Sequence, residues 1–180
     1  QRQMCKETAF ADVGVNQHIA LFCNKNVLSC AGHFLFFLKV LLLANHVQIS
    51  LCYSNIIKGN VTLVQTSGEG GSGIFSGSGP VTLDEAIVNI SGKFSNGILT
   101  RCANKSENIT IKNHSDVIIN LPDGANNNGL CIYGNGSEKN LTISDSTVNI
   151  RTCESPVFVN GTGSSVSIKD SVVDLTCLLY

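Results

Sequence analysis

The sequence predicts an all-β protein, a solenoid of about four to five stacked coils, and two repeated motifs and their spacing carry this prediction. The first motif is apolar–hydroxyl–apolar and occurs four times, at 81–83, 109–111, 141–143 and 166–168. The second motif is apolar–polar–apolar and follows each copy, at 88–90, 119–121, 148–150 and 173–175. Copies of the first motif start 28, 32 and 25 residues apart. Short alternating strands repeated at such a period indicate stacked β-coils.

The N-terminal segment, residues 1–46, differs from the repeats. Its run 34–43 is almost wholly apolar, with Lys39 in the middle. A membrane-spanning helix needs about 20 uninterrupted apolar residues, so we do not expect membrane association. We expect a helix over this run that caps an open end of the solenoid, and a membrane or signal-like segment is the alternative.

Residues 47–180 form the expected β-helix domain. Each coil has a third apolar strand led by glycine or proline, at 97–99, 129–132 and 156–159. A degenerate first coil is expected over 47–75, and its glycine-rich loop 67–73 lacks the Gly-Lys-Ser/Thr ending of a phosphate-binding loop. The last coil ends at Tyr180 without a third strand, so we expect the domain to be cut short there.

The polar residues inside the motifs are expected to face outward in rows, because alternate side chains of a strand point to opposite faces. The first row is Thr82, Thr110, Thr142 and Ser167, and the second is Asn89, Asn120, Asn149 and Asp174. A third series lies between the two strands of each coil and consists of Glu85, Asn113, Asp145 and Asp170. Carboxylates and amides favour such bends, because they bond the local backbone and tolerate unusual φ/ψ values.

Eight cysteines leave two interpretations open: small buried core residues, or disulfides of an extracellular chain. Eight Asn-x-Ser/Thr sequences also occur, but those at Asn60, Asn108 and Asn140 occupy one repeat position and are explained by the repeat itself. A zinc site would use Cys23, Cys30, His33, His46 and Cys52. Their spacing lacks a Cys-x2-Cys pair, which favours a structural role.

Composition argues against two classes of function. The net charge is −1 and basic residues are scattered, so we do not expect nucleic-acid binding. Acid–base cleavage of a polysaccharide needs converging carboxylates. The adjacent pair Asp84–Glu85 is expected to face opposite sides of its strand, and Arg101 and Arg151 lie far from it in sequence. We therefore expect no enzyme, and keep a polysaccharide lyase or hydrolase and an ice-binding protein as alternatives.

The clearest repeat, 140–150, resembles repeats of right-handed parallel β-helix proteins from bacterial surfaces and secretions, of the carbohydrate-binding or adhesin type found in gut anaerobes. The resemblance covers about 47–180. It implies a glycan or polysaccharide partner, in some members with calcium, and an extracellular or cell-surface location. It is equally compatible with a purely structural spacer.

The candidate ligand site consists of the two outward rows together with Tyr133. Sugar faces stack on aromatic rings, and Tyr133 and Phe94, both beside glycine-containing turns, are the aromatic residues we expect to be exposed. Asp145 and Asp170 occupy equivalent positions of consecutive coils, so a calcium ion would be held between their carboxylates. The alternative is that each of these two residues only forms its turn.

Overall fold

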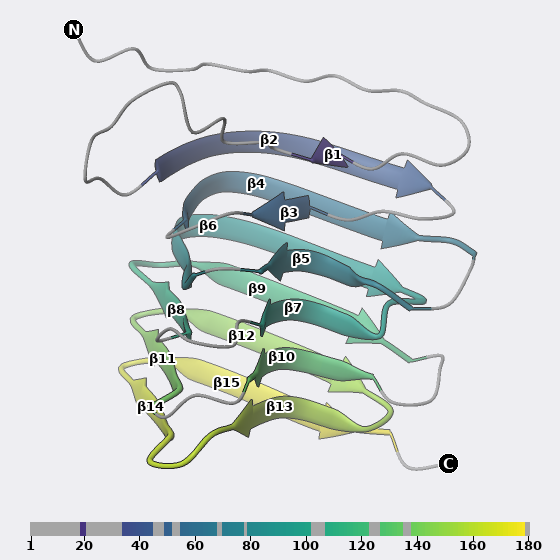
Figure 1. Ribbon diagram of the computed structural model, residues 1–180. Coiled ribbons are helices and arrows are strands. Elements are labelled where there is room, and N and C mark those ends of the chain that lie inside the picture. Colours follow the sequence, from purple (N-terminus) through teal and green to yellow (C-terminus); the bar gives the residue numbers. More distant parts are fainter. Residues whose placement is uncertain are drawn as a thin grey trace, which may run out of the picture.

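The computed structural model describes residues 19–20, 34–44, 49–51, 55–67, 70–77, 79–101, 107–122, 127–134 and 138–178. These residues form a parallel β-solenoid of about four turns and include no helix (Figure 1). Every strand pair among them is parallel, which excludes the alternative of antiparallel hairpins. The predicted all-β solenoid is confirmed.

One face of the solenoid is a six-stranded sheet. Its strands are, in spatial order, β1 (Ile19–Ala20), β3 (Ile49–Leu51), β5 (Ser72–Ser76), β7 (Asn96–Arg101), β10 (Asn128–Tyr133) and β13 (Ser155–Asn160). In Figure 1, β5, β7, β10 and β13 lie one below another along the stack. Neighbouring strands in this sheet come from consecutive coils.

The other two faces belong to a nine-stranded sheet. Its strands are β2 (Phe34–Ala44), β4 (Asn55–Gln65), β6 (Val81–Gly92), β8 (Asn108–Lys112), β9 (Asp116–Leu121), β11 (Asn140–Ser144), β12 (Thr147–Thr152), β14 (Ser165–Lys169) and β15 (Val172–Cys177). The long strand β6 joins the two faces, because its first part pairs with β8 and its second part with β9. Later coils divide this span into two strands separated by a corner.

The apolar run near the N-terminus is a strand and not the helix we predicted. It forms β2, which pairs with β4 in register from Phe34–Asn55 to Ala44–Gln65. A continuous apolar run has neither a helical nor a strand period, and here the free edge of β4 supplies a hydrogen-bonding partner. Apart from β1 and β2, residues 1–46 lie outside the described residues. Within the part of the chain that is described, no helix has the length and hydropathy to cross a membrane.

The first apolar residue of each copy of the first motif belongs to one inward row, as expected if the polar residue between the two apolar ones faces outward. The strand registers place Val81, Ile109, Leu141 and Val166 side by side on consecutive coils. The first three are fully buried, whereas Val166, in the last described coil, is 52% exposed. Another inward row comes from the six-stranded sheet and joins Ile74, Ile98, Leu130 and Val157. Together these rows fill the interior of the solenoid.

Three glycines allow the six-stranded sheet to approach the opposite face closely. A Cβ on Gly97 would lie 2.7 Å from Cγ2 of Ile119, and one on Gly73 would lie 2.8 Å from Cγ2 of Ile90. A Cβ on Gly129 would collide with Ile150 in the same way. The glycines that lead the third strands are therefore required by the close packing of isoleucines against the backbone.

Candidate functional site

The corner between the first and second strands of each coil is built around left-handed residues. Glu85, Asn113, Asp145 and Asp170 have φ values of 53°, 56°, 48° and 50°. These are the four residues of the corner series, so their predicted role as bend formers is confirmed. The coil that contains Asn113 has a second left-handed residue in its corner, His114, with φ 59°.

A serine closes three of these corners. Ser115 donates its hydroxyl to the carbonyl of Lys112 (2.7 Å) and accepts the backbone N–H of Ala86 from the preceding coil (3.1 Å). Ser171 accepts the N–H of Ser146 in the same way (3.2 Å), and Ser146 and Ser171 each donate to a carbonyl within their own corner. Each hydroxyl thus satisfies backbone groups that the bend removes from the sheet.

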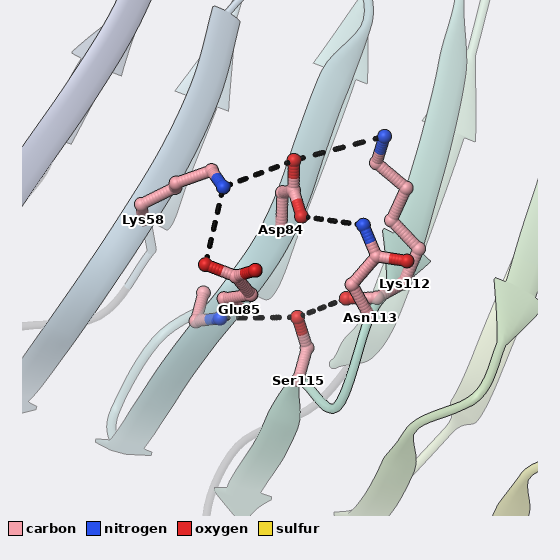
Figure 2. A network of polar contacts seen from close by, with 7 residues as sticks. Lys58, Asp84, Glu85, Lys112, Asn113 and Ser115 are labelled. Atoms are coloured by element: carbon pink, nitrogen blue, oxygen red, sulfur yellow. Dashed lines mark hydrogen bonds and ion pairs between the residues drawn. The ribbon is translucent and has the colours of Figure 1, made fainter.

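A network of charged residues surrounds the corner between Leu83 and Ala86 (Figure 2). The Asp84 carboxylate lies 3.6 Å from Nζ of Lys58 and 3.7 Å from Nζ of Lys112. It also accepts a hydrogen bond of 2.8 Å from Nδ2 of Asn113. The two lysines come from the coils on either side, so the buried Asp84 links three coils.

Asp84 and Glu85 do not face opposite sides as we predicted, because both contact the same lysine. Lys58 Nζ donates to Oε2 of Glu85 at 3.2 Å while it also pairs with Asp84. The left-handed φ of Glu85 interrupts the strand alternation and turns its side chain towards Lys58. The two carboxylates therefore share one cation across the corner, as Figure 2 shows.

The electrostatics of this network suit a structural role. Burial raises the pKa of Asp84, but the Asn113 hydrogen bond and the charges of Lys112 and Lys58 outweigh it, and the net pKa lies below its usual range. The hydrogen bond to Glu85, together with the Asp84 charge, raises the pKa of Lys58 although burial opposes the shift. A general acid needs a raised carboxyl pKa, so Asp84 does not fit that role.

The two aspartates of the calcium prediction each contact a basic side chain. Asp145 Oδ1 lies 3.3 Å from Nδ1 of His114, and Asp170 Oδ2 lies 3.8 Å from Nζ of Lys169. Among the described residues, no group of three or more His, Cys, Asp or Glu side chains is arranged to hold a metal ion. Calcium binding at these corners stays a prediction.

The threonine row has the predicted register. Thr82 pairs with Thr110, Thr110 with Thr142, and Thr142 with Ser167, so the four hydroxyls lie on consecutive coils. Strands within a sheet are about 4.8 Å apart, which sets the spacing of the row. Thr82, Thr110 and Thr142 are half-buried and Ser167 is exposed.

The second outward row differs from the prediction at one position. Asn89 pairs with Ile118, which pairs with Asn149, and Asn149 pairs with Asp174. Asn120 instead pairs with Ser91 and Arg151, two residues further along the strand. A shift of two residues preserves the face, so Asn120 is exposed as predicted although its row is not. The exposed Ile118 takes its place.

The predicted exposure of the two aromatic residues is correct for Tyr133 and wrong for Phe94. Tyr133 is 43% exposed, whereas Phe94 is 1% exposed and belongs to the hydrophobic core. Phe94 lies in the turn between β6 and β7, and the sequence does not reveal that this turn folds its ring inward. Tyr133 lies at the end of β10 on the outer surface of the six-stranded sheet.

Tyr133 belongs to a cluster that the sequence did not reveal, here named the aromatic platform: Phe75, Leu99, Arg101, Cys131, Tyr133 and Phe158. Its centre is a stacked pair of aromatic rings. The ring centroids of Tyr133 and Phe158 are 6.2 Å apart, and the interplanar angle is 24°. The Arg101 guanidinium lies 5.6 Å from the centre of the Tyr133 ring. Phe158 is 36% exposed.

The buried member of the platform is Cys131, which lies between Leu99 and Phe158 on consecutive strands. Burial, with a smaller contribution from the charge of Glu154, raises the pKa of the Cys131 thiol to about 11. Cys131, Cys153 and Cys177 are thiols, and the other cysteines lie outside the described residues. For Cys131 the interpretation as a small buried residue is confirmed.

A buried ion pair was also missed by the sequence analysis. Nζ of Lys139 donates to Oε2 of Glu107 at 3.0 Å, and both side chains are fully buried. The two residues precede β8 and β11, so the pair joins consecutive coils. Each residue directly precedes one of the equivalent repeat positions Asn108 and Asn140, and this shared position was the available signal. Because both side chains are fully buried, the pair is not accessible to a ligand.

Among the described residues, the aromatic platform is an exposed surface with the chemistry of a binding site, and the charged network around Asp84 links coils. No protein-family model, curated protein or solved structure matches this chain.

Proposed function

We propose that this chain is a non-catalytic binding module that holds a glycan on the aromatic platform. The observation that carries the proposal is the exposed, stacked pair of Tyr133 and Phe158 with Arg101 beside it. The apolar faces of sugar rings pack on aromatic rings, and a guanidinium supplies several hydrogen-bond donors for hydroxyl or carboxylate oxygens.

The availability of Arg101 supports this proposal. Within the described part of the chain its guanidinium makes no ion pair, whereas the lysines of the corner network each contact a carboxylate. Arg101 is also exposed. Its donors are therefore oriented by Tyr133 and available to a ligand.

The rigidity of the sheet supports it further. Arg101, Tyr133 and Phe158 lie on three consecutive parallel strands, so their spacing is fixed by hydrogen-bond register and not by a loop. A surface that needs no ordering on binding loses less entropy when a ligand arrives. We extend the proposal to an extracellular or cell-surface location of the adhesin type, with a calcium ion held between Asp145 and Asp170.

The test is a glycan array probed with the wild-type chain, with Y133A/F158A and with I118A, each with and without calcium. We expect glycans that bind the wild type to lose at least about 90% of their signal with Y133A/F158A. This corresponds to a loss of about 1.4 kcal/mol or more of binding free energy. Ile118 is the matched control, because it is an exposed apolar residue on another face. Binding that survives Y133A/F158A would contradict the platform as the site.

A structural spacer is the second candidate, favoured by the way polar groups pair between coils. Asn128 Nδ2 donates to Oδ1 of Asn96, the Asn140 N–H donates to Oδ1 of Asn108, and Ser165 Oγ donates to Oδ1 of Asn140. Such ladders stiffen the stack without any ligand. An array on which no glycan binds the wild type would favour this second candidate.

A further inference from the structure

We infer that the ligand of the aromatic platform is a linear glycan of at least three sugar units that lies along the solenoid axis. The inference rests on the proposed function and adds the shape and direction of the ligand. It follows from the register of the outer side chains of the six-stranded sheet.

One row of the platform is apolar and runs across four coils. Phe75 pairs with Leu99, Leu99 with Cys131, and Cys131 with Phe158. Phe75 and Leu99 are partly exposed, and Phe158 is exposed. A Cβ on Gly77 would lie 3.4 Å from the Phe75 ring, so Gly77 places no side chain over that ring. Cys131 is buried, so on β10 the exposed ring is that of Tyr133. Apolar groups therefore reach the surface on each of the four strands β5, β7, β10 and β13.

The second row is polar and lies beside the first. Arg101 pairs with Tyr133, and Tyr133 pairs with Asn160. All three are exposed, and they follow the apolar row by two residues on each strand. A ligand on the apolar row would thus have hydrogen-bonding groups along one side on β7, β10 and β13, but not on β5, where Gly77 has the equivalent position.

The proportions of the platform distinguish a chain from a single sugar. Along the axis, three strand spacings of about 4.8 Å give a length of about 14 Å. Across the axis, the two outward positions of each strand are only about 7 Å apart. The repeat of a pyranose chain is close to one strand spacing, so successive units of an extended chain would meet successive coils.

The ligand class that fits these features is a glycan with an extended backbone and flat apolar ring faces. A branched or terminal epitope would contact only the Tyr133–Phe158 pair and leave Phe75, three coils from Phe158, without a role. Phe75 therefore separates the two ligand shapes, because it belongs to the platform but lies far from its aromatic centre.

The experiment titrates β-1,4-linked gluco-oligosaccharides and α-1,4-linked oligogalacturonides of one to six units against the wild type, F75A and I118A. We expect affinity in the series that binds to rise with each unit to three or four units and then to level off. We expect F75A to weaken tetramer binding about ten-fold or more, which corresponds to loss of one stacking contact, and to leave dimer binding unchanged. I118A should match the wild type.

Two results would overturn the inference. One is equal affinity for monomer and hexamer, or a hexamer affinity that F75A leaves unchanged while melting curves show the variant is folded. The other is a glycan array on which only branched or terminal epitopes bind and lose binding with Y133A/F158A. That second result would retain the proposed function and reject the linear ligand. Glycan binding that Y133A/F158A leaves unchanged would reject both.

Discussion

Gly97 and Ile119 face each other across the interior of the solenoid, where a Cβ on the glycine would lie 2.7 Å from Cγ2 of the isoleucine. The same position is 2.7 Å from the carbonyl oxygen of Gly129 in the next coil. The backbone carbonyl cannot move without disturbing the β7–β10 ladder. The size of the solenoid interior is therefore set by a glycine opposite a large side chain.

The first prediction is that G97A destabilises the protein by about 1–3 kcal/mol, because overpacking displaces backbone and side chains. The measurement is the free energy of unfolding from denaturant titration. G77A is the matched control, since a Cβ there would have ordinary clearance of 3.4 Å or more. Equal stability of G97A and G77A would show that the two faces can separate freely.

The second prediction concerns a buried position and its outward neighbour. Ile143 is 1% exposed, whereas the side chain of Thr142 belongs to the outward row. I143D should lower the free energy of unfolding by several kcal/mol, because it buries a carboxylate without a partner. It should also unfold the coils around it. T142D should change stability by about 0.5 kcal/mol. Thermal melts followed by circular dichroism compare the two.

A further control for this prediction is I168D, in the same inward row of the last described coil. Ile168 is 50% exposed, so a carboxylate there stays hydrated and should be tolerated far better than in I143D. Similar melting temperatures for I143D and T142D would mean that the inward and outward faces are reversed.

The third prediction isolates the left-handed corner at Glu85. E85N and E85V both lose the ion pair with Lys58, but only valine strongly disfavours φ near 53°. We expect E85V to be less stable than E85N by about 1–2 kcal/mol. The difference in the free energy of unfolding measures this directly, and equal values would indicate that the corner changes its backbone conformation in E85V.

The fourth prediction is a loss of stability in acid that depends on Asp84. Its pKa is lower in the folded chain than the ordinary value of 3.8, so its contribution is complete above that value and disappears as the pH falls through the folded pKa. Melting temperatures between pH 2 and pH 7 should fall less steeply at the acid end for D84N than for the wild type. T110V, an outward change without charge, should keep the wild-type slope. Parallel curves for D84N and the wild type would exclude the proposed linkage.

The fifth prediction concerns the thiol of Cys131. A pKa of about 11 leaves little thiolate at neutral pH, and the side chain is 4% exposed. Iodoacetamide at pH 8 should therefore modify the exposed Cys177 well before Cys131 in the native protein, and both at similar rates in denaturant. Peptide mass spectrometry over a time course decides this, and early labelling of Cys131 would indicate that the platform opens.

The architecture was predictable because the inward residues repeat. Val81, Ile109, Leu141 and Val166 share one motif, and solenoid stacking is the arrangement that buries all of them together. The corner series was predictable for a related reason, since bends of this kind favour acidic and amide residues. In both cases local sequence and tertiary structure favour the same conformation.

Other features that depend on register between coils were not predictable, although the threonine row was. The corner before Ser115 contains both Asn113 and His114 in left-handed conformations, and this extra residue accompanies the shift that moves Asn120 out of its expected row. The platform was missed for the same reason, because Arg101, Tyr133 and Phe158 are brought together only by strand pairing. The apolar strand β2 was missed because its sequence has no period.

Parallel stacking also determines how the chain can fold. Paired residues of successive coils are separated by similar lengths of chain, such as Val81–Ile109, Ile109–Leu141 and Leu141–Val166. The entropy of closing each new coil is therefore nearly constant, because it depends only logarithmically on loop length. A completed coil offers a ready template of donors, acceptors and apolar side chains to the next. Folding should accordingly proceed as growth from a nucleus along the axis, with a rate per coil that does not depend on how many coils already exist.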